Sequence, residues 1–426
     1  MAELAILGGE PVLPNPLRPY RTMGAAEAEA VKRVVESDCL SGFYGSAGDQ
    51  FLGGPRVKEF EAAWSARFRV RHTVSVNSAT SGLYAAMGAI GIRPGDEVIV
   101  PPLTMSATAM APLVYGGVPV FADVEPETFC LDVDAVRRAI TPRTRAILAV
   151  NLFGHPAPLV RLRALADEHG IKLVEDNAQG PLASEDGRHA GTIGHVGVFS
   201  LNYHKHIHTG EGGMCVTDDD DLALRMQMIR NHAENVVEAY DVQDLTNLVG
   251  FNYRLTELSA AVGLEQLRRI DEHVGPRVRL AETLTAMTED LEGITPPRVR
   301  PGCTHAYYVW AFRLDEEAAG VSREAFSRAL AAEGFPHGAG YVRPLYLLPL
   351  FQRRPEESGV FGSALAAGRY PAGLCPVAER LHRSELLLFE TCAYDVDART
   401  AGLLGEAVRK VHANRGALAE LAPAGV

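Results

Sequence analysis

The sequence contains few of the residues from which metal clusters, disulfide scaffolds and membrane spans are built. Its six cysteines include no C-x-x-C pair, so neither a zinc ribbon nor a disulfide-stapled fold is indicated. No run of about 18 apolar residues is present, which argues against a transmembrane helix. The first thirty residues lack the basic start and apolar centre of a signal peptide, and we therefore expect a cytoplasmic protein.

Positive charge is also scarce. Lys and Arg total 41 against 53 Asp and Glu, which gives a formal net charge of −12. Such a chain lacks the electrostatic footprint of a nucleic-acid binder, and we expect neither nucleic acid nor membrane as a partner. Only five of the 426 residues are lysines, so each lysine can be inspected in turn. The hydrophobic content of 47% is that of a folded protein, and the length favours one large and one small domain.

The apolar pattern divides the chain into three parts. Four prolines predict an extended arm over 1–22. Short apolar strands then alternate with helical stretches, which is typical of a mostly parallel sheet covered on both faces. We predict an α/β fold with a large domain over 23–275 and a smaller C-terminal α+β domain over 276–426. Strands of the large domain are expected at 73–76, 97–100, 118–122, 145–149, 172–175, 196–200 and 213–217, a long helix at 254–275, a small-domain strand at 307–314, and helices at 322–333 and 395–414.

The first candidate site is the tetrapeptide Asn77-Ser78-Ala79-Thr80, between a strand and a helix. The first turn of a helix carries free backbone N–H groups and the positive end of the dipole, so it can hold a phosphate. Thr80 would add a hydroxyl. The alternative is an ordinary N-cap, in which Asn or Ser only satisfies the helix start.

The second candidate is Asp176, directly after a buried strand. Ligands of open parallel sheets lie beyond the carboxyl ends of the strands. A carboxylate at that place can hold a buried cationic nitrogen. The alternative is a carboxylate that caps the following helix.

The third candidate is Lys205, in a loop between two apolar strands and just before Gly210-Glu211-Gly212-Gly213. Burial would lower the pKa of this lysine and make its amine available as a nucleophile. The alternating His204, His206 and His208 could suggest a metal site, but no carboxylate or Cys at ligand spacing completes it. We therefore expect no metal, and the glycine run lacks the spacing of a dinucleotide-binding fingerprint.

Together these candidates supply the parts of one cofactor site. Pyridoxal 5'-phosphate (PLP) needs a lysine for its aldehyde, a carboxylate for its ring nitrogen and a helix start for its phosphate. Lys205, Asp176 and the Asn77–Thr80 turn provide these three groups in one α/β domain.

The sequence resembles the DegT/DnrJ/EryC1/StrS family of sugar aminotransferases, which have the type I fold of PLP-dependent transferases. The resemblance runs from about residue 5 to 415. It rests on four ordered motifs at the family's spacing: Ala79-Thr80; Asp176-Asn177-Ala178-Gln179; Phe199-Ser200 with Lys205 and Gly210 to Gly213; and Gly250, Asn252, Arg254 and Glu257.

The resemblance implies a role for each matching residue. Lys205 would bond the cofactor's aldehyde and then carry the proton between cofactor and substrate. Asp176 would pair with the pyridine nitrogen, and Gln179 would contact the ring hydroxyl. Asn252 would reach the phosphate across the interface of a homodimer with shared active sites. The phosphate itself would be bound by Ala79, Thr80 and Ser200.

The chain departs from the family pattern in two places. Ala79 replaces the usual glycine of the phosphate loop, and a methyl group fits there if the residue has helical φ. Met105 follows Thr104 where the family usually has an aromatic residue that stacks on the cofactor, and sulfur–aromatic contact is the expected substitute. Family dehydratases carry histidine where this chain has Lys205, so the resemblance implies transamination.

The resemblance also implies the substrates. The donor would be L-glutamate or L-glutamine. The acceptor would be a keto sugar, expected to be nucleotide-linked, or a cyclitol ketone in amino-sugar or antibiotic biosynthesis. A PLP-dependent sugar dehydratase and a non-catalytic binding protein with this fold are the alternatives. Candidate substrate-binding residues are His337, Tyr341, Arg343 and Tyr346, in a segment that faces the active site in relatives; the alternative for this segment is a surface loop with an aromatic core residue.

Overall fold

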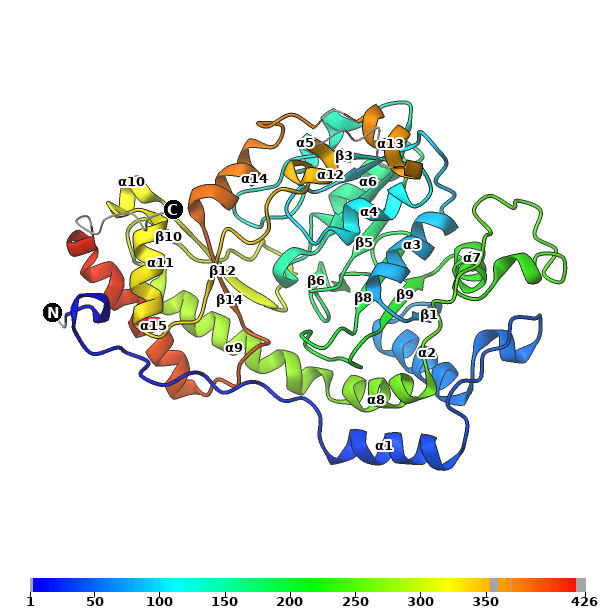
Figure 1. The fold of residues 1–426 in the computed structure, drawn as a ribbon, viewed down its shortest axis with the longest axis horizontal. Helices are drawn as coiled ribbons and strands as arrows, with labels where there is room; N and C mark the ends of the chain where they lie inside the picture. Colours follow the sequence, from blue (N-terminus) through cyan, green and yellow to red (C-terminus); the bar gives the residue numbers. More distant parts are fainter. Residues whose placement is uncertain (1–2, 353–358, 369, 419–426) are drawn as a thin grey trace.

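The structure is a computed structural model that describes residues 3–352, 359–368 and 370–418. A central sheet and its helices occupy one part of the molecule, and a smaller antiparallel sheet with helices of its own lies beside it (Figure 1). The predicted α/β architecture is confirmed. No helix in the described ranges is both long and apolar enough to cross a membrane.

The central sheet has seven strands, and its spatial order brings the ends of distant segments together. The β8, β5, β4, β2 and β3 strands are mutually parallel, whereas β9 runs antiparallel to both of its neighbours. Each strand lies within two residues of its predicted position at either end. In spatial order the strands are β1 (His72–Val76), β9 (Gly213–Thr217), β8 (Val196–Ser200), β5 (Lys172–Asp176), β4 (Thr144–Val150), β2 (Glu97–Val100) and β3 (Val118–Phe121).

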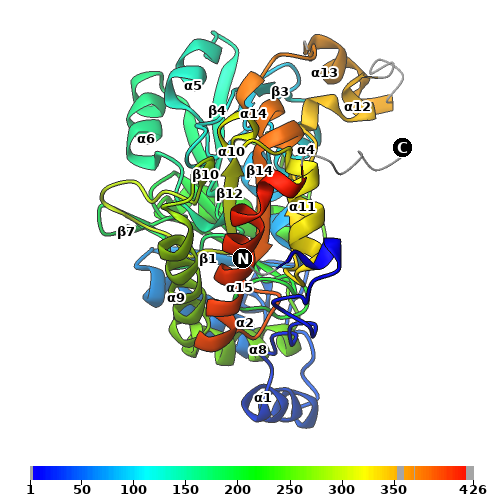
Figure 2. The ribbon, with the colours of Figure 1, turned by 90° about the vertical axis from the view of Figure 1, so that its left-hand side faces the viewer.

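Helices cover both faces of this sheet because its strands are apolar on both sides. Figure 2 shows α5 and α6 on one side of the sheet and α4 on the other. Ser78 caps α3, where its Oγ accepts a hydrogen bond from the N–H of Ser81. The helices of this part are α2 (Pro55–Phe68), α3 (Ala79–Ala89), α4 (Ala107–Leu113), α5 (Val133–Ala139), α6 (Leu159–Glu168), α7 (Asp220–Arg230) and α8 (Glu257–Arg268).

The expected single helix over 254–275 is two helices. The first, α8, ends at Arg268, and α9 (Ile270–Thr288) begins after Arg269, whose φ of −108° and ψ of 14° leave the helical region. Neither Gly nor Pro marks the break, and the apolar pattern continues across it. The sequence therefore gives no sign that the helix ends there. The second helix carries the chain from the large core to the small one, where its buried residues include Leu280, Ala281 and Leu284.

The small domain is built on an antiparallel sheet, in the order β10, β12, β14, β13. Its core contains Trp310, Phe312 and Phe389, and the N-terminal arm adds Leu4 and Leu13 to it. The elements are β10 (Ile294–Thr295), β12 (Val309–Leu314), β13 (Gly338–Ala339), β14 (Leu386–Glu390), α10 (Glu316–Ala319), α11 (Arg323–Ala332) and α15 (Ala398–Ala413). A third small sheet joins β6 (Ser184–Glu185), β7 (Arg188–His189) and β11 (Cys303–Thr304).

One segment differs from the expected division into domains. Between β13 and β14 the chain returns to the large domain, where the backbone N–H of Leu345 donates to Pro102 O at 2.8 Å. Tyr346 and Tyr370 pack their rings on Phe121 of β3. The helices α12 (Pro349–Gln352) and α13 (Gly362–Ala367) of this segment lie near β3 (Figure 1). The next helix, α14 (Pro376–Arg380), is bound to the large domain by the N–H of Val377, which donates to Asp123 Oδ2 at 2.8 Å. The N-terminal α1 (Ala25–Glu36) packs on α8.

Candidate active site

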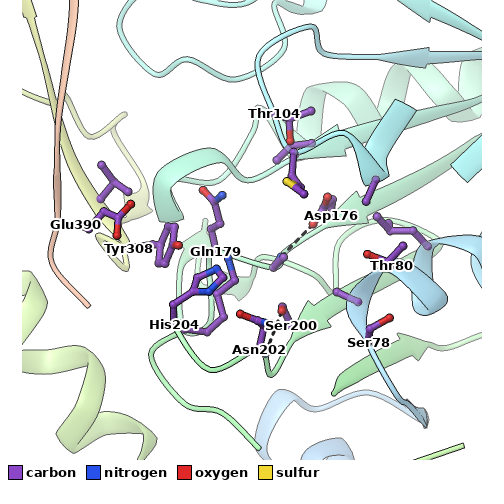
Figure 3. Close-up of a pocket in the computed structure, with 18 of the residues that line it drawn as sticks. Ser78, Thr80, Thr104, Asp176, Gln179, Ser200, Asn202, His204, Tyr308 and Glu390 are labelled. Carbon is purple, nitrogen blue, oxygen red and sulfur yellow. Dashed lines mark hydrogen bonds between the residues drawn. The ribbon is translucent and has the colours of Figure 1, made fainter. Parts of the chain in front are cut away.

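A pocket with a volume of about 260 Å³ lies beyond the carboxyl ends of the parallel strands. The strands β4, β5 and β8 end at its wall with Val150, Asp176 and Ser200, and the start of α3 forms a second wall. The small domain closes it with Tyr308 and Glu390 (Figure 3), and Leu388 also lines it. Of the residues predicted from sequence, it collects Ala79, Thr80, Met105, Asp176, Gln179, Ser200, Lys205 and Tyr341.

Lys205 lies in the loop that joins β8 to β9. Its Nζ is 4.2 Å from the centre of the Tyr308 ring, on the small domain. In the described chain this amine has no hydrogen bond or ion pair. Burial lowers the pKa of Lys205 to about 8, against the opposing influence of Asp176, Cys392 and Glu390. The amine is therefore far closer to its neutral, nucleophilic form at neutral pH than an exposed lysine would be.

The neighbouring His206 fixes this loop. Its Nε2 is 2.9 Å from the carbonyl oxygen of Ala306, just ahead of β12. Burial lowers the pKa of His206 to about 3, so the ring is neutral and donates this hydrogen bond. His208 has a different partner, since its Nε2 lies 2.8 Å from Thr22 Oγ1. No group of three or more His, Cys, Asp or Glu side chains in the described ranges could hold a metal.

Asp176 ends β5 and is almost completely buried. The hydroxyl of Thr108 donates to its Oδ2 at 3.0 Å, and the N–H of Ala178 donates to its Oδ1 at 3.2 Å. Burial raises the pKa of Asp176, and these two hydrogen bonds and Lys205 oppose the rise. The carboxylate lines the pocket without an ion pair in the described chain, so a cationic ring nitrogen would complete its environment.

Gln179 is held at the pocket wall by both ends of its amide. Its Oε1 accepts a hydrogen bond from the N–H of Phe153 at 2.6 Å, and its Nε2 donates to Tyr341 Oη at 3.2 Å. The Tyr341 ring packs edge-on against Phe153. Two polar side chains, one from each domain, are thereby fixed beside the same cavity.

The opposite wall fits a phosphate. Ala79 and Thr80 open α3, where helical geometry leaves their N–H groups without intrahelical acceptors. Ser200 lines the pocket beside them. A Cβ added to Gly213 would lie 2.7 Å from the N of Ala79, so only glycine lets β9 pass this close to the helix start. Lysine, buried carboxylate and helix start therefore fit PLP in chemistry and in placement.

Several predicted residues lie elsewhere. Asn252 is exposed and outside this pocket, with its carbonyl accepting from Asn77 Nδ2 at 3.3 Å. Its motif also has a structural role within the chain, because buried Glu257 accepts the N–H groups of Arg56 and Val57 at the start of α2. Met105 lines the pocket but is 62% exposed, so its thioether lies near the mouth.

Of the four predicted substrate residues, the structure brings only Tyr341 to the pocket. Tyr346 is fully buried, with its hydroxyl donating to Glu379 Oε1 at 2.5 Å, because its segment packs onto the large domain. His337 lies against Ser327, with its Nε2 2.7 Å from the serine Oγ. Arg343 is exposed and does not line the pocket. Tyr346 is thus the aromatic core residue of the alternative interpretation.

Sequence reasoning missed the contributions of Thr108, Asn202, Tyr308 and Glu390. Asn202 stands within the motif that runs from Phe199 to Gly213, whereas Thr108, Tyr308 and Glu390 belong to no motif that indicates chemistry. Tyr308 and Glu390 come from the small domain, more than 100 residues after Lys205, and Thr108 lies inside α4. Only the fold brings Thr108, Tyr308 and Glu390 to the residues that are predicted to bind the cofactor.

Comparison with known proteins agrees with this geometry. Residues 45–369 match the model of the DegT/DnrJ/EryC1/StrS aminotransferase family. The L-glutamine:2-deoxy-scyllo-inosose aminotransferase of Streptomyces kanamyceticus is 36% identical, over 98% of this chain and 99% of its own. The GDP-perosamine synthase of Caulobacter vibrioides is 33% identical, over 78% and 86% of the two chains.

Solved structures give the same result. The crystal structure of DesV from S. venezuelae superposes with a TM-score of 0.79 at 32% identity, covering 93% of this chain and 99% of DesV. An aminotransferase from Psychrobacter cryohalolentis superposes with a TM-score of 0.81 at 27% identity, covering 94% and 99%. The chain belongs to the DegT/DnrJ/EryC1/StrS aminotransferase family, and it is a PLP-dependent aminotransferase.

Proposed function

We propose that this protein transfers an amino group from L-glutamine or L-glutamate to the ring ketone of a cyclitol or keto sugar in a cytoplasmic biosynthetic pathway. The observation that carries the proposal is the convergence of Lys205 and Asp176 in one pocket, with the helix start of α3 at its other wall. A lysine with a lowered pKa and a buried carboxylate are the two side chains that amine transfer through PLP requires.

The names of the relatives support the substrate class. Three relatives at 35–36% identity, each matched over 94% or more of this chain, are named L-glutamine:2-deoxy-scyllo-inosose aminotransferases. The GDP-perosamine synthase, at 33% identity, is the counterpart associated with a nucleotide-linked sugar. A cyclitol ketone and glutamine therefore form the first pair of substrates to be tested.

Residues of this chain would bind PLP at its phosphate, its ring nitrogen and its ring hydroxyl. PLP, when bound, supplies an aldehyde that bonds amines and a ring that withdraws electrons from the substrate carbon. Ala79, Thr80 and Ser200 would hold its phosphate, and Asp176 would keep its ring nitrogen protonated. Gln179 would donate from Nε2 toward the ring hydroxyl.

Lys205 would act as the general acid and base. Once its Nζ is free, the neutral amine accepts the proton from the α-carbon of the donor, and the resulting ammonium returns a proton on the cofactor side. The pKa of about 8 suits both steps, because neither protonation state is strongly disfavoured near neutral pH. The loop bond from His206 to Ala306 keeps the amine beside the cavity throughout.

We also propose that the active unit is a homodimer in which Asn252 enters the partner's site. Asn252 is exposed and lies outside the pocket of its own chain. It belongs to the motif to which the family resemblance assigns this contact. Apolar side chains near the pocket mouth are exposed in the single chain, with Tyr203 at 69% and Met105 at 62%. A second copy that covered them would exclude water from the site.

Substitution of Lys205 by Ala tests the proposed function. We expect the variant to fold but to lose both the visible absorption of bound PLP and all transamination, and the exposed Lys32→Ala serves as control. Turnover near the wild-type rate in Lys205→Ala would contradict the assignment. Release of a deoxygenated ketone without amine transfer would indicate the dehydratase, and a wild-type chain that takes up no PLP would indicate the binding protein.

Mixed dimers test the shared site. Lys205→Ala and Asn252→Ala are each expected to be impaired alone. A heterodimer of the two variants would carry one site with intact Lys205 from one chain and intact Asn252 from the other. Recovery of activity on mixing, toward half of the wild-type value per dimer, is the expected result, and no recovery would contradict the proposed dimer.

A further inference from the structure

The pocket has two ends of different chemistry. Figure 3 shows Ser78 and Thr80 on one side of the cavity, and Tyr308 and Glu390 on the opposite side. The first side is the helix start that fits the cofactor's phosphate. The second side is formed by the small domain, and it is left for the substrate. In this chain, the groups at the Tyr308 end are therefore the ones placed to recognise the acceptor.

The lining of the pocket is acidic. Among the described residues that form it, Lys205 is the one lysine or arginine, whereas Asp176, Glu211 and Glu390 are carboxylates. His204 does not add a second cation, because burial and Lys205 lower its pKa to about 4. A bound PLP phosphate would make the site more negative still.

Glu390 differs from the other two carboxylates in having no partner. Asp176 accepts hydrogen bonds from Thr108 and Ala178, and Glu211 accepts one from Asn202 Nδ2 at 2.9 Å. The side chain of Glu390 has no hydrogen bond or ion pair in the part of the chain that the structure describes. It stands at the end of β14, opposite Val309, so two paired strands fix its backbone.

An unpaired carboxylate recognises some ligands and disfavours others. It accepts hydrogen bonds from hydroxyl groups, and such charge-assisted bonds are stronger than neutral ones. It also repels phosphates that come close to it, and because Glu390 is exposed in the single chain, water screens part of this repulsion. In a nucleotide-linked sugar the first phosphate is bonded directly to the anomeric oxygen, so it would enter the pocket together with the ring.

We propose that Glu390 is a specificity-determining residue, which accepts hydrogen bonds from ring hydroxyls of an unphosphorylated polyhydroxy ketone and disfavours nucleotide-linked sugars. This inference rests on the proposed function, and it selects the cyclitol-like class among its acceptors. Tyr308 and His204, which line the same end, are neutral groups that can donate to or accept from further hydroxyls. The Tyr308 end of the pocket can therefore bind hydroxyl groups, and the described lining has no lysine or arginine besides Lys205 to pair with a diphosphate.

Separate measurement of the two half reactions tests this inference. The holoenzyme is first reacted with L-glutamine or L-glutamate, and the aminated form is then mixed with 2-deoxy-scyllo-inosose or with a nucleoside-diphosphate-linked 4-keto-6-deoxyhexose. Wild type is expected to prefer the unphosphorylated ketone. Glu390→Gln is expected to lower kcat/KM for that ketone by about tenfold or more, chiefly through KM, because a charged hydrogen-bond acceptor is lost. The donor half reaction should lose no rate, since the donor lacks the ring hydroxyls and its carboxylate would meet less repulsion from the neutral glutamine side chain than from Glu390.

The controls separate recognition from folding and from general electrostatics. Asp395→Asn removes a carboxylate of the following loop that does not line the pocket, and it should leave both half reactions unchanged. Glu390→Lys should shift the ratio of the two kcat/KM values toward the nucleotide-linked ketone. Equal losses in both half reactions of Glu390→Gln would overturn the inference, because they would show an effect on Lys205 instead.

Failure of this inference can be told apart from failure of the proposed function. A wild-type enzyme that reacts with the donor but prefers the nucleotide-linked ketone overturns the inference and leaves the aminotransferase proposal standing. An enzyme that reacts with the donor but aminates neither ketone also contradicts the acceptor class stated here. A holoenzyme that reacts with neither amino acid contradicts the proposed donors, and with them the proposed function.

Discussion

Lys205 Nζ stands 4.2 Å from the centre of the Tyr308 ring, so the lysine of the large domain rests on an aromatic face of the small domain. The hydrogen bond from His206 to Ala306 joins the same two segments one residue further on. The position of the amine therefore depends on how the domains pack. The ring also offers its negative face to the ammonium form, which stabilises a charge that burial disfavours.

Substitutions of Tyr308 should separate these effects. Tyr308→Phe keeps the ring, and we expect the pKa of Lys205 to stay near its original value. Tyr308→Leu removes the cation–π contact, which is worth about 0.5–2 kcal/mol, so the pKa of Lys205 should fall by about 0.4–1.5 units. The pH dependence of PLP uptake by the cofactor-free protein measures this pKa. Equal behaviour of the Phe and Leu variants would show that the ring face does not act on the amine.

The pH dependence of reconstitution is a second prediction. The pKa of Lys205 lies near 8, and only the neutral amine attacks an aldehyde. Because burial favours the neutral form, the reactive fraction rises from roughly one-tenth at pH 7 to roughly nine-tenths at pH 9. The rate of appearance of the visible band should increase about tenfold over this interval and then level off.

Asp176→Asn provides the matched comparison for this profile. Asp176 raises the pKa of Lys205, so its neutralisation should move the inflection to lower pH. An inflection that stays in place would show that Asp176 does not act on the amine. An inflection near 10, in wild type, would mean that Lys205 is not buried as the structure shows.

The sequence predicted the sheet well because burial on both faces leaves continuous apolar runs. Val98, Ile99 and Val100 of β2, for example, are all fully buried, and the predicted and observed bounds of this strand coincide. The break at Arg269 was missed because nothing in its residues differs from the helical pattern around it. The return of the Tyr346 segment to the large domain was missed because it depends on contacts with β3, more than 200 residues away.

The candidate site divides in the same way. The sequence could predict that four features share one site, because each belongs to a short motif that is recognisable without the fold. These features are Lys205, Asp176, Gln179 and the start of α3. Tyr346 could not be distinguished from Tyr341 by sequence, since both are tyrosines of one segment. Packing buries the first in the core and leaves the second beside Gln179. Three further residues of the site could not be predicted from the sequence, because they reach it only through the fold. These residues are Thr108, Tyr308 and Glu390.

The hydrogen bond from Thr108 to Asp176 gives a third prediction. Thr108→Val keeps the shape of the side chain but removes the donor 3.0 Å from Asp176 Oδ2. The pKa of the buried carboxyl should rise further, which weakens its pairing with the cofactor's ring nitrogen. We expect PLP to bind about tenfold less tightly, as measured by equilibrium dialysis. Thr283→Val, at a half-buried site of α9 where the hydroxyl bonds its own helix, should bind PLP as wild type does.

Gly213 tests the phosphate end of the pocket. A Cβ at this position would lie 2.7 Å from Ala79 N and 2.8 Å from Ser78 C, both of them backbone atoms at the start of α3. Gly213→Ala must therefore push the helix start away from β9, which displaces the N–H groups that face the phosphate. We expect weaker PLP binding and a loss of about 1–3 kcal/mol in the free energy of unfolding.

Gly402→Ala is the control for this substitution. Gly402 lies within α15, where an added Cβ meets no atom within 4 Å. Alanine is the better helix former, so this variant should gain about 0.5–1 kcal/mol and bind PLP normally. If Gly213→Ala lost stability but kept its PLP affinity, the close approach of β9 to α3 would serve packing alone. If Gly213→Ala lost more PLP affinity than its loss of stability accounts for, the start of α3 would be identified as the phosphate site.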